Sequence, residues 1–179
     1  MNEIIQMVAA IQINSNPEMD NGIGFNNDTL IRFGSDMKHY VEKTTFEPDH
    51  PVIMGSKTYF SVDEKYRPFK GRTNIVISRN TGLSLPAGVI LASSPEAAYI
   101  AARKISKNVS IVGGGVIYDE FFKMGVINRL ELTILETNFP ADTYFPVAWK
   151  TFGSKVTTSN RFFEEKKQIH YRFETRDLL

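Results

Sequence analysis

Three short segments contain the residue types best able to do chemistry, and a run of glycines is the most specific of them. Gly113, Gly114 and Gly115 separate an apolar, strand-like run from a helix-like run that includes Tyr118. Glycine lets a backbone approach a ligand closely, and free N–H groups at a helix N-terminus attract phosphate. The spacing matches neither the G-x-G-x-x-G fingerprint nor a P-loop. A phosphate-binding turn and a purely structural turn are the two interpretations.

The second segment surrounds Asp36, which lies near the predicted start of a short helix among the apolar residues Phe33, Met37 and Tyr40. A carboxylate in a first helical turn commonly serves only as a partner for the helix dipole. In apolar surroundings it can instead accept a pair of hydrogen bonds from an amidine-like edge of a heterocycle. The residues alone leave both interpretations open.

The third segment is the turn Arg67–Arg72, which places basic side chains directly before an apolar strand. An arginine there can clamp a carboxylate through two parallel hydrogen bonds, and a solvated turn is the alternative. No metal site is expected, because the three histidines show no ligand spacing. We expect His39 on a solvated helix face, His50 in a loop and His170 on an alternating strand. No nucleophile elbow is present.

The composition excludes several classes of protein. The 179 residues fit one domain, 1–179, and 21 Lys+Arg against 20 Asp+Glu give a net charge of +1. The absence of cysteine excludes disulfide scaffolds, Cys-ligated zinc modules, iron–sulfur proteins and thiol enzymes. The balanced charge gives no reason to expect nucleic acid or a membrane surface as a partner. Residues 1–5 lack a basic signal region, and we expect a cytoplasmic protein.

Predicted strands and helices alternate over two thirds of the chain, and these elements must position the groups described above. Strands are predicted at 4–13, 51–54, 73–78, 89–92 and 109–112. Helices are predicted at 36–42 after a capping Ser35, at 56–62, at 94–104 and at 116–123, with a loop over 14–28. Segments 129–136 and 169–176 alternate as half-exposed antiparallel strands do. This pattern predicts an α/β fold whose central, mostly parallel sheet ends in an antiparallel C-terminal hairpin. Such sheets bind ligands beyond the carboxyl ends of their strands.

Taken together, these segments resemble the dihydrofolate reductase family over about residues 7–176. The segments that carry the resemblance are Val8–Ile11, Gly22–Gly24, Asp36–Lys38, Pro51–Gly55, Lys57–Tyr59, Gly71–Ser78, Val112–Gly115 and Asp142–Pro146. The resemblance implies flanking helices on a dihydrofolate reductase-like sheet. It also implies reduction of 7,8-dihydrofolate to tetrahydrofolate, by hydride transfer from NADPH to pterin C6 with protonation at N5. A monomer that binds dihydrofolate and antifolate-type small molecules is expected.

The resemblance also assigns roles on the substrate side. Asp36 would bind the pterin and assist protonation, Thr133 would support that carboxylate, and Tyr118 would lie beside the nicotinamide. Arg72 would clamp the α-carboxylate of the glutamate tail. The remaining residues implied to line the substrate site are Val8, Ala9, Tyr40, Phe69 and Val112.

For the cofactor, the resemblance implies backbone contacts from the glycine turn and basic residues around the phosphates. The peptide between Gly113 and Gly114 is predicted to be cis. The residues implied to bind NADPH are Ala10, Ile23, Gly55, Lys57, Thr58, Ser78, Arg79, Gly114, Gly115, Val116, Ile117 and Tyr118.

The chain departs from the family pattern at two places. Ile31 stands where the mobile lid usually has an indole, so the water that the indole orders loses a donor. At the site of the cofactor's 2′-phosphate, Ser56 replaces a common arginine, and Lys57 and Arg79 are the candidates to compensate.

Two other functions remain as alternatives. One is a related NADPH-dependent reductase that acts on a ribosylated pyrimidine of riboflavin synthesis. The other is a non-catalytic nucleotide-binding domain, suggested by the missing lid indole. Asp36 together with the Arg72 turn favours folate, because a ribosylaminopyrimidine has no glutamate tail.

Overall fold

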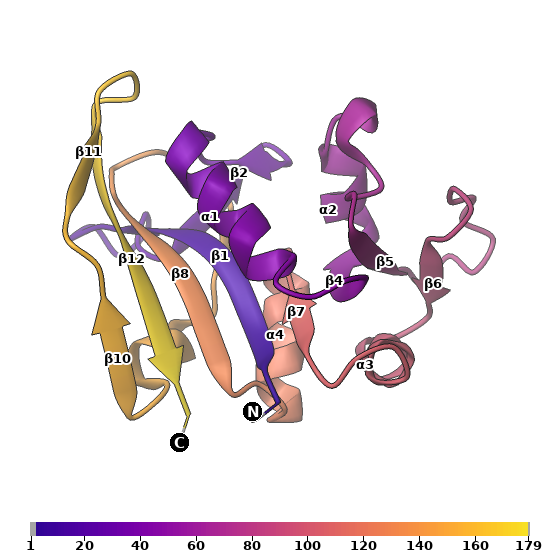
Figure 1. The fold of residues 1–179 in the computed structure, drawn as a ribbon. Helices are drawn as coiled ribbons and strands as arrows, with labels where there is room; N and C mark the ends of the chain where they lie inside the picture. Colours follow the sequence, from indigo (N-terminus) through magenta and orange to yellow (C-terminus); the bar gives the residue numbers. More distant parts are fainter. Residues whose placement is uncertain (1–2, 179) are drawn as a thin grey trace.

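A nine-stranded sheet runs through the part of the chain that the structure, a computed structural model, describes (Figure 1). The described residues are 3–178, so Met1 and Asn2 of the N-terminal segment considered above lie outside them. The strand order is β10-β12-β8-β1-β7-β4-β5-β6, and β11 pairs with β12. The parallel strands are β1 (Ile5–Ile13), β4 (His50–Gly55), β5 (Arg72–Ile77), β6 (Ile90–Ala92), β7 (Val109–Ile111) and β8 (Arg129–Glu136).

The C-terminal strands are antiparallel, as the sequence predicts. They are β10 (Lys155–Thr158), β11 (Phe162–Glu164) and β12 (Ile169–Asp177), and β12 also pairs antiparallel with β8. A second, three-stranded sheet consists of β3 (Asp28–Thr29), β2 (Gly22–Phe25) and β9 (Thr143–Tyr144). The predicted α/β architecture with a mostly parallel sheet is therefore confirmed.

Helices flank both faces of the large sheet. Helix α1 (Gly34–Thr44) crosses one face in front of β1 and β8, and α4 (Gly115–Met124) lies behind the sheet (Figure 1). The other helices are α2 (Ser56–Ser61), α3 (Pro95–Arg103) and the short 3₁₀ helices η1 (Glu64–Tyr66) and η2 (Val147–Thr151). None of the helices in residues 3–178 has the length and apolar character to span a bilayer.

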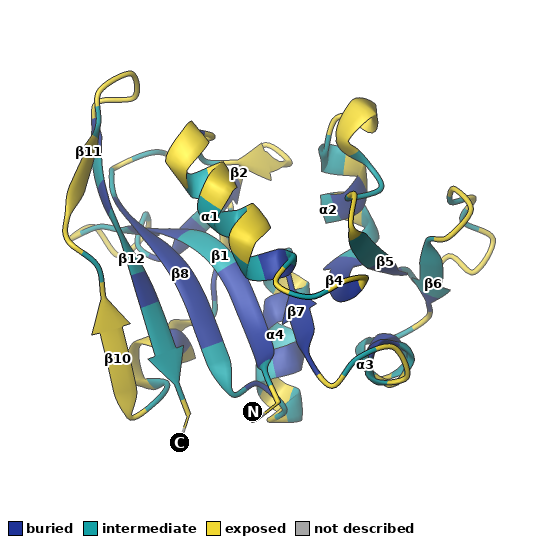
Figure 2. Ribbon diagram, viewed as in Figure 1, coloured by how far each residue is buried: buried dark blue, intermediate teal, exposed yellow. Residues whose placement is uncertain are grey.

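Apolar residues fill both faces of the central strands, which are the most buried part of the molecule (Figure 2). In β4, Ile53 points into the larger cluster together with residues of α3 and α4. Val52 and Met54 point the other way and pack with Tyr59 of α2. A strand that is buried on both faces has a continuous apolar sequence, and for this reason these strands could be predicted from the sequence.

Three sequence expectations about local structure are wrong. Ser35 does not cap α1, because the helix begins at Gly34 and no side chain caps it. Residues 14–28 are not entirely loop, since β2 forms there by pairing with β9. Strand β8 is buried rather than half-exposed, and its polar residues Glu131 and Thr133 lie beneath α1 with partners from other elements.

Two of the histidines also differ from expectation. The His39 ring stacks on Phe173 of β12 at 4.0 Å between centroids, and its Nε2 is buried without a partner. Burial lowers the pKa of His39 to about 4, and the charge of Lys43 contributes. His50 opens β4 rather than lying in a loop, and it is fully buried between Glu47 and Ser110. Within residues 3–178, no cluster of three or more His, Asp or Glu side chains could hold a metal ion.

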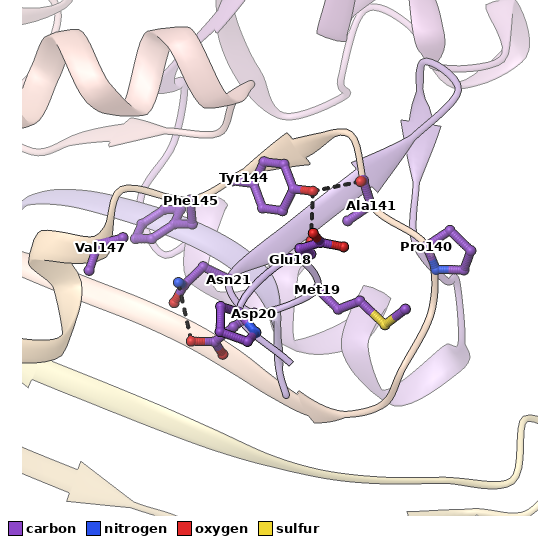
Figure 3. A pocket seen from close by; sticks show the side chains of 10 residues that line it. Glu18, Met19, Asp20, Asn21, Pro140, Ala141, Tyr144, Phe145 and Val147 are labelled. Carbon is purple, nitrogen blue, oxygen red and sulfur yellow. Dashed lines mark hydrogen bonds between the residues drawn. The ribbon is translucent and has the colours of Figure 1, made fainter. Parts of the chain in front are cut away.

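The segment 14–21, which leads into β2, is fastened to the chain around β9 and η2. Trp149 donates from Nε1 to Asn21 at 2.7 Å, and Lys150 forms an ion pair with Asp20. The Tyr144 hydroxyl lies within hydrogen-bond distance of the carbonyls of Glu18 and Ala141 (Figure 3). An open hollow in this region contains none of the predicted site residues. Its lining residues are Pro17, Glu18, Met19, Asp20, Asn21, Pro140, Ala141, Tyr144, Phe145 and Val147.

Candidate active site

Asp36 and Thr133 lie far apart in the sequence and come together in the fold. Asp36 lies in the first turn of α1, and Thr133 lies on β8, where it is in register with Ala10 of β1. Burial raises the pKa of the Asp36 carboxyl, and a hydrogen bond from the Thr133 side chain partly opposes that shift. The structure therefore places a carboxyl of increased proton affinity over the sheet. This is the pairing that the sequence resemblance implied.

An apolar wall with one cation lies further along α1. The rings of Tyr40 and Phe69 meet edge to face at 6.0 Å, and the Arg72 guanidinium lies 4.7 Å from the Phe69 ring centroid. Arg72 donates from Nη1 to Thr44 Oγ1 at 2.9 Å and from Nε to the Lys70 carbonyl. These bonds leave some of the five guanidinium N–H groups for a ligand. The three predicted residues Tyr40, Phe69 and Arg72 thus form one group.

The glycine turn lies where β7 ends and α4 begins. The Gly113–Gly114 peptide is cis, as predicted. The Gly55 N–H donates to the Gly113 carbonyl at 2.9 Å, which joins the ends of β4 and β7. A Cβ on Gly114 would lie 3.0 Å from Thr58 Oγ1, and one on Gly115 would lie 2.8 Å from the Tyr144 carbonyl. Side chains at these positions would crowd backbone or side-chain atoms, so glycine is favoured there and the backbone of the turn stays uncovered.

Tyr118 connects this turn to β1. Its hydroxyl donates to the Val8 carbonyl at 2.7 Å, and the side chain is buried. Burial holds the pKa of Tyr118 well above its ordinary value, so the hydroxyl stays protonated and donates. Val112, just before the turn, is also buried, and its N–H donates to the Ile53 carbonyl. The predicted residues Val8, Val112 and Tyr118 are therefore neighbours around the turn.

The predicted phosphate contacts are spread over three neighbouring element ends. Gly55 and Ile77 are in register, so Lys57 and Arg79 follow the carboxyl ends of adjacent parallel strands, and both are exposed. Val116, in the first turn of α4, is 75 % exposed. Ile117 lies against Gly55, where a Cβ would come 3.1 Å from its Cγ1. Ser78 is held by donation from its N–H to the Ala92 carbonyl.

Two predicted residues occupy different surroundings from the others. The Ala9 side chain packs against the cluster on the α3 and α4 side, so its backbone alone faces the Asp36 side of β1. Ile23 lies on β2 and packs against the same cluster. Sequence reasoning missed Thr44, which holds Arg72, and Asn74, which bonds both the N–H and the carbonyl of Phe69. Asn74 had only its position two residues after Arg72 as a signal, and Thr44 had none.

Comparison with known proteins identifies the family to which the chain belongs. The family model described as "Dihydrofolate reductase" matches residues 4–177. The chain belongs to the dihydrofolate reductase family. It is 33 % identical over 160 residues to dihydrofolate reductase from Drosophila melanogaster, covering 86 % of this chain and 88 % of that one. It is 32 % identical over 169 residues to the enzyme from Rattus norvegicus (86 % and 89 % covered) and 36 % identical over 138 residues to that from Gallus gallus (69 % and 69 %).

Enzymes of the dihydrofolate reductase family use NADPH, and the residues at the glycine turn fit that cofactor. The first N–H groups of α4, from Gly115 to Ile117, have no partner within the helix and carry the positive end of its dipole. The bare backbone of Gly114 and Gly115 allows an anionic group to approach them closely. The exposed cations Lys57 and Arg79 are placed at the neighbouring strand ends.

Proposed function

We propose that this chain reduces 7,8-dihydrofolate to 5,6,7,8-tetrahydrofolate with NADPH, with Asp36 as the group that binds and helps to protonate the pterin. The observation that carries this proposal is the Asp36 carboxyl, whose pKa is raised by burial and which is hydrogen-bonded to Thr133. A carboxyl in such surroundings can accept two hydrogen bonds from the 2-amino group and N3 of a pterin. The proposal assigns catalytic roles to Asp36, Thr133 and Tyr118.

The proton required at pterin N5 enters the site under the control of Asp36. Because burial raises the pKa of Asp36, the carboxyl keeps its proton to higher pH than an exposed aspartate does. Thr133 fixes the orientation of the carboxyl by hydrogen bonding, so the two oxygens present a fixed edge to the ring. In its protonated form Asp36 can give up a proton toward N5, and the carboxylate that results then accepts the hydrogen bonds of the 2-amino group and N3.

The hydride comes from bound NADPH, and the protein's part in its transfer is positioning. Transfer requires the donor and acceptor carbons at near-attack distance, so the walls of the site must be rigid. The Tyr118 bond to the Val8 carbonyl ties α4 to the middle of β1, and the Gly55 bond to the Gly113 carbonyl ties the end of β4 to the glycine turn. These ties give the nicotinamide side of the site a fixed frame. The Ala10 backbone, two residues after Val8 on β1, is the proposed contact for the carboxamide.

Arg72 is the proposed clamp for the glutamate tail of the substrate. Its guanidinium is held in place by Thr44 and by the Phe69 ring, and no acidic side chain of residues 3–178 forms an ion pair with it. A planar guanidinium fixed in this way is pre-organised for a carboxylate. Tyr40 and Phe69 would pack against the rings that precede the tail.

For the cofactor's phosphates, we propose backbone and side-chain contacts on neighbouring elements. The N–H groups of Gly114, Gly115, Val116 and Ile117 would face the pyrophosphate, as the dipole of α4 favours. Lys57, Thr58, Ser78 and Arg79 would surround the remaining phosphate. Gly55 and Ile23 would contribute apolar contacts.

The direct test is loss of NADPH absorbance on mixing purified protein with dihydrofolate. Turnover is expected, and none is expected with the ribosylated pyrimidine of riboflavin synthesis. Turnover of the pyrimidine but not of dihydrofolate would replace this proposal with the first alternative. NADPH binding without turnover of either would favour a non-catalytic nucleotide-binding domain.

We also propose that residues 1–179 form one domain that acts as a monomer in the cytoplasm, without nucleic acid or membrane as a partner. Antifolates of the diaminopyrimidine type would bind at Asp36, because they present the same amidine-like edge as the pterin. Light scattering over a range of concentrations tests the monomer, and a dimer mass at all concentrations would contradict it.

A further inference from the structure

A second contact between α1 and β8 lies two helical turns beyond the one at Asp36. The Lys43 ammonium lies 3.0 Å from Glu131 Oε2, and Thr175 of β12 donates to the same oxygen at 2.8 Å. Glu131 is only 1 % exposed, whereas Lys43 is about one-third exposed. A carboxylate buried to this degree needs a partner, because losing its hydration is costly. Lys43 pairs with the Glu131 carboxylate as its cation, and Thr175 donates a hydrogen bond to it.

The two contacts share one face of each element. Glu131 and Thr133 are two residues apart on β8, so both side chains point toward α1. Asp36 and Lys43 are seven residues apart on α1, which returns to the same face after two turns. From Asp36 to Lys43 the helix advances about 10 Å, whereas from Thr133 to Glu131 the strand advances about 7 Å. The long Lys43 side chain spans the difference. The helix is therefore tied to the strand at two points.

Other bonds fix the Lys43 end of the helix. The Gln6 side chain donates to the Lys43 carbonyl at 2.7 Å, and Gln6 also donates to Ser110. Between the two ties, the His39 ring stacks on Phe173, which is directly opposite Thr133 in the sheet. The rotation of α1 about its axis is thus set by groups on β1, β8 and β12 together.

We infer that Lys43 and Glu131 are positioning residues for Asp36: their ion pair seats α1 so that the Asp36 carboxyl meets Thr133, and it balances the charge beneath the helix. The inference rests on the proposed role of Asp36. The pair does not touch the reacting atoms. It acts on Asp36 through the position of the helix and through the electric field of its two charges. Removal of Lys43 leaves the buried Glu131 with Thr175 and with Arg129, which lies 4.0 Å away and is held by Asp177, and removal of Glu131 leaves Lys43 without its ion-pair partner.

The charged and titratable neighbours of these groups are few. On α1, Tyr40 interacts with Asp36, and the charge of Arg72 acts on Tyr40 from β5. The charges of Lys43 and Glu42 act on His39 in opposite directions. On β8, Arg129 approaches Glu131 at 4.0 Å but is held by Asp177 at 2.6 Å. Lys43 is therefore the cation nearest to Glu131.

The test is a titration of the Asp36 carboxyl by ¹³C NMR, together with the pH profile of hydride transfer, in single-charge variants. In Lys43→Met the unpaired Glu131 should raise the Asp36 pKa, and in Glu131→Gln the unpaired Lys43 should lower it. Each shift is expected to be about half a pH unit or more, since the groups interact through a poorly screened layer. Lys43→Arg keeps the charge and should behave as the wild type does.

Lys38→Met is the matched control, because Lys38 lies on the same helix, closer in sequence to Asp36, but is 76 % exposed. Solvent screens its charge, so the titration should not move. Glu131→Gln keeps both hydrogen-bond partners and is expected to fold even if Lys43→Met does not. An unchanged or raised Asp36 pKa in Glu131→Gln would overturn the inference, as would an equal shift in Lys38→Met. The NMR titration reports on Asp36 even if Asp36→Asn proves fully active, so failure of the proposed function is seen separately.

Discussion

The Tyr118 hydroxyl donates a hydrogen bond to the Val8 carbonyl across 2.7 Å, joining the first turn of α4 to the middle of β1. The bond is buried and crosses the point where the glycine turn separates β7 from α4. A Cβ on Gly113 would come within 3.5 Å of the same hydroxyl. One phenol thus holds a strand carbonyl and borders the turn that we propose binds NADPH.

Tyr118→Phe removes this donor and leaves the Val8 carbonyl buried and unpaired. A lost buried hydrogen bond costs about 1–3 kcal/mol, so we expect hydride transfer to slow by about tenfold with a lower melting temperature. Single-turnover kinetics with deuterated NADPH would measure the transfer step. Tyr66→Phe, on exposed η1, is the control and should change neither quantity. An unchanged transfer rate in Tyr118→Phe would remove Tyr118 from the catalytic residues.

Asp36→Asn tests the proposed proton donor. We expect the rate at neutral pH to fall by about 100-fold or more, the range typical of general acids, while NADPH affinity changes little. In the wild type, the rate should decline as pH rises past the raised pKa of Asp36, because the protonated fraction is lost. That limb should be absent from the variant's profile. Asp63→Asn, at the exposed N-cap of η1, is the control, and equal loss in both variants would contradict the role of Asp36.

The same substitution is expected to stabilise the fold at neutral pH. Because the folded-state pKa of Asp36 is raised, the folded protein binds the proton more tightly than the unfolded chain does. The free energy of unfolding therefore falls as pH rises between the unfolded and folded pKa values, and that loss persists above both. Asp36→Asn should melt up to a few degrees higher than the wild type at pH 7, and no higher at pH 3. A variant that melts lower at pH 7 would show that the charged carboxylate stabilises the fold.

Arg72→Leu should weaken binding of the glutamate tail selectively. Loss of a bidentate charged contact is expected to raise the KM for dihydrofolate by about 10- to 100-fold, with NADPH affinity unchanged. A dihydropterin that lacks the glutamate provides the control substrate, since its KM should not respond. Steady-state kinetics would give the KM for both substrates. An equal increase of the two KM values would indicate a general disturbance of α1 through Thr44.

Lys57→Ala and Arg79→Ala should reduce the preference for NADPH over NADH. Each exposed cation is expected to contribute about 1 kcal/mol or less, which corresponds to a change of up to about fivefold in the ratio of kcat/KM values. Ser56→Arg should move the ratio in the opposite direction. Lys65→Ala, on η1, serves as the charge-matched control. If the kcat/KM values for NADH and NADPH change by the same factor in every variant, these residues do not contact the 2′-phosphate.

Ile31→Trp restores the indole that the lid of the family usually has. Ile31 is partly buried and packs against the cluster of Phe33, Leu135, Ile169 and Tyr171, so the larger ring is expected to cost about 1–3 kcal/mol of stability. If the indole orders a water beside Asp36, the solvent isotope effect on turnover should fall and the rate should rise. An unchanged isotope effect would mean that this lid delivers protons without an indole.

Sequence reasoning succeeded where local pattern decides structure. The apolar runs of β1 and β4, the cap at Ser94 and the glycine turn after β7 all follow from a few neighbouring residues. The grouping of Asp36, Thr133, Arg72 and Tyr118 came from the order of several motifs together.

What the sequence did not predict depends on partners far along the chain. Glu131 looked solvent-exposed because a strand pattern does not show that Lys43 and Thr175 will cover and neutralise it. His39 looked solvated because its cover, Phe173, lies on the last strand. Thr44 gave no signal, since its role is to hold Arg72.

The ties on segment 14–21 have a mechanical consequence for the lid. Trp149, Lys150 and Tyr144 hold this segment just before β2, and the Asp142 N–H also donates to the Gly24 carbonyl. These bonds hold β2 in place, so we expect any change of backbone conformation that admits or releases ligand to be confined to residues 25–33. Trp149→Phe removes the hydrogen bond to Asn21 and should extend such a change into segment 14–21 and β2, which carries the proposed cofactor contact Ile23.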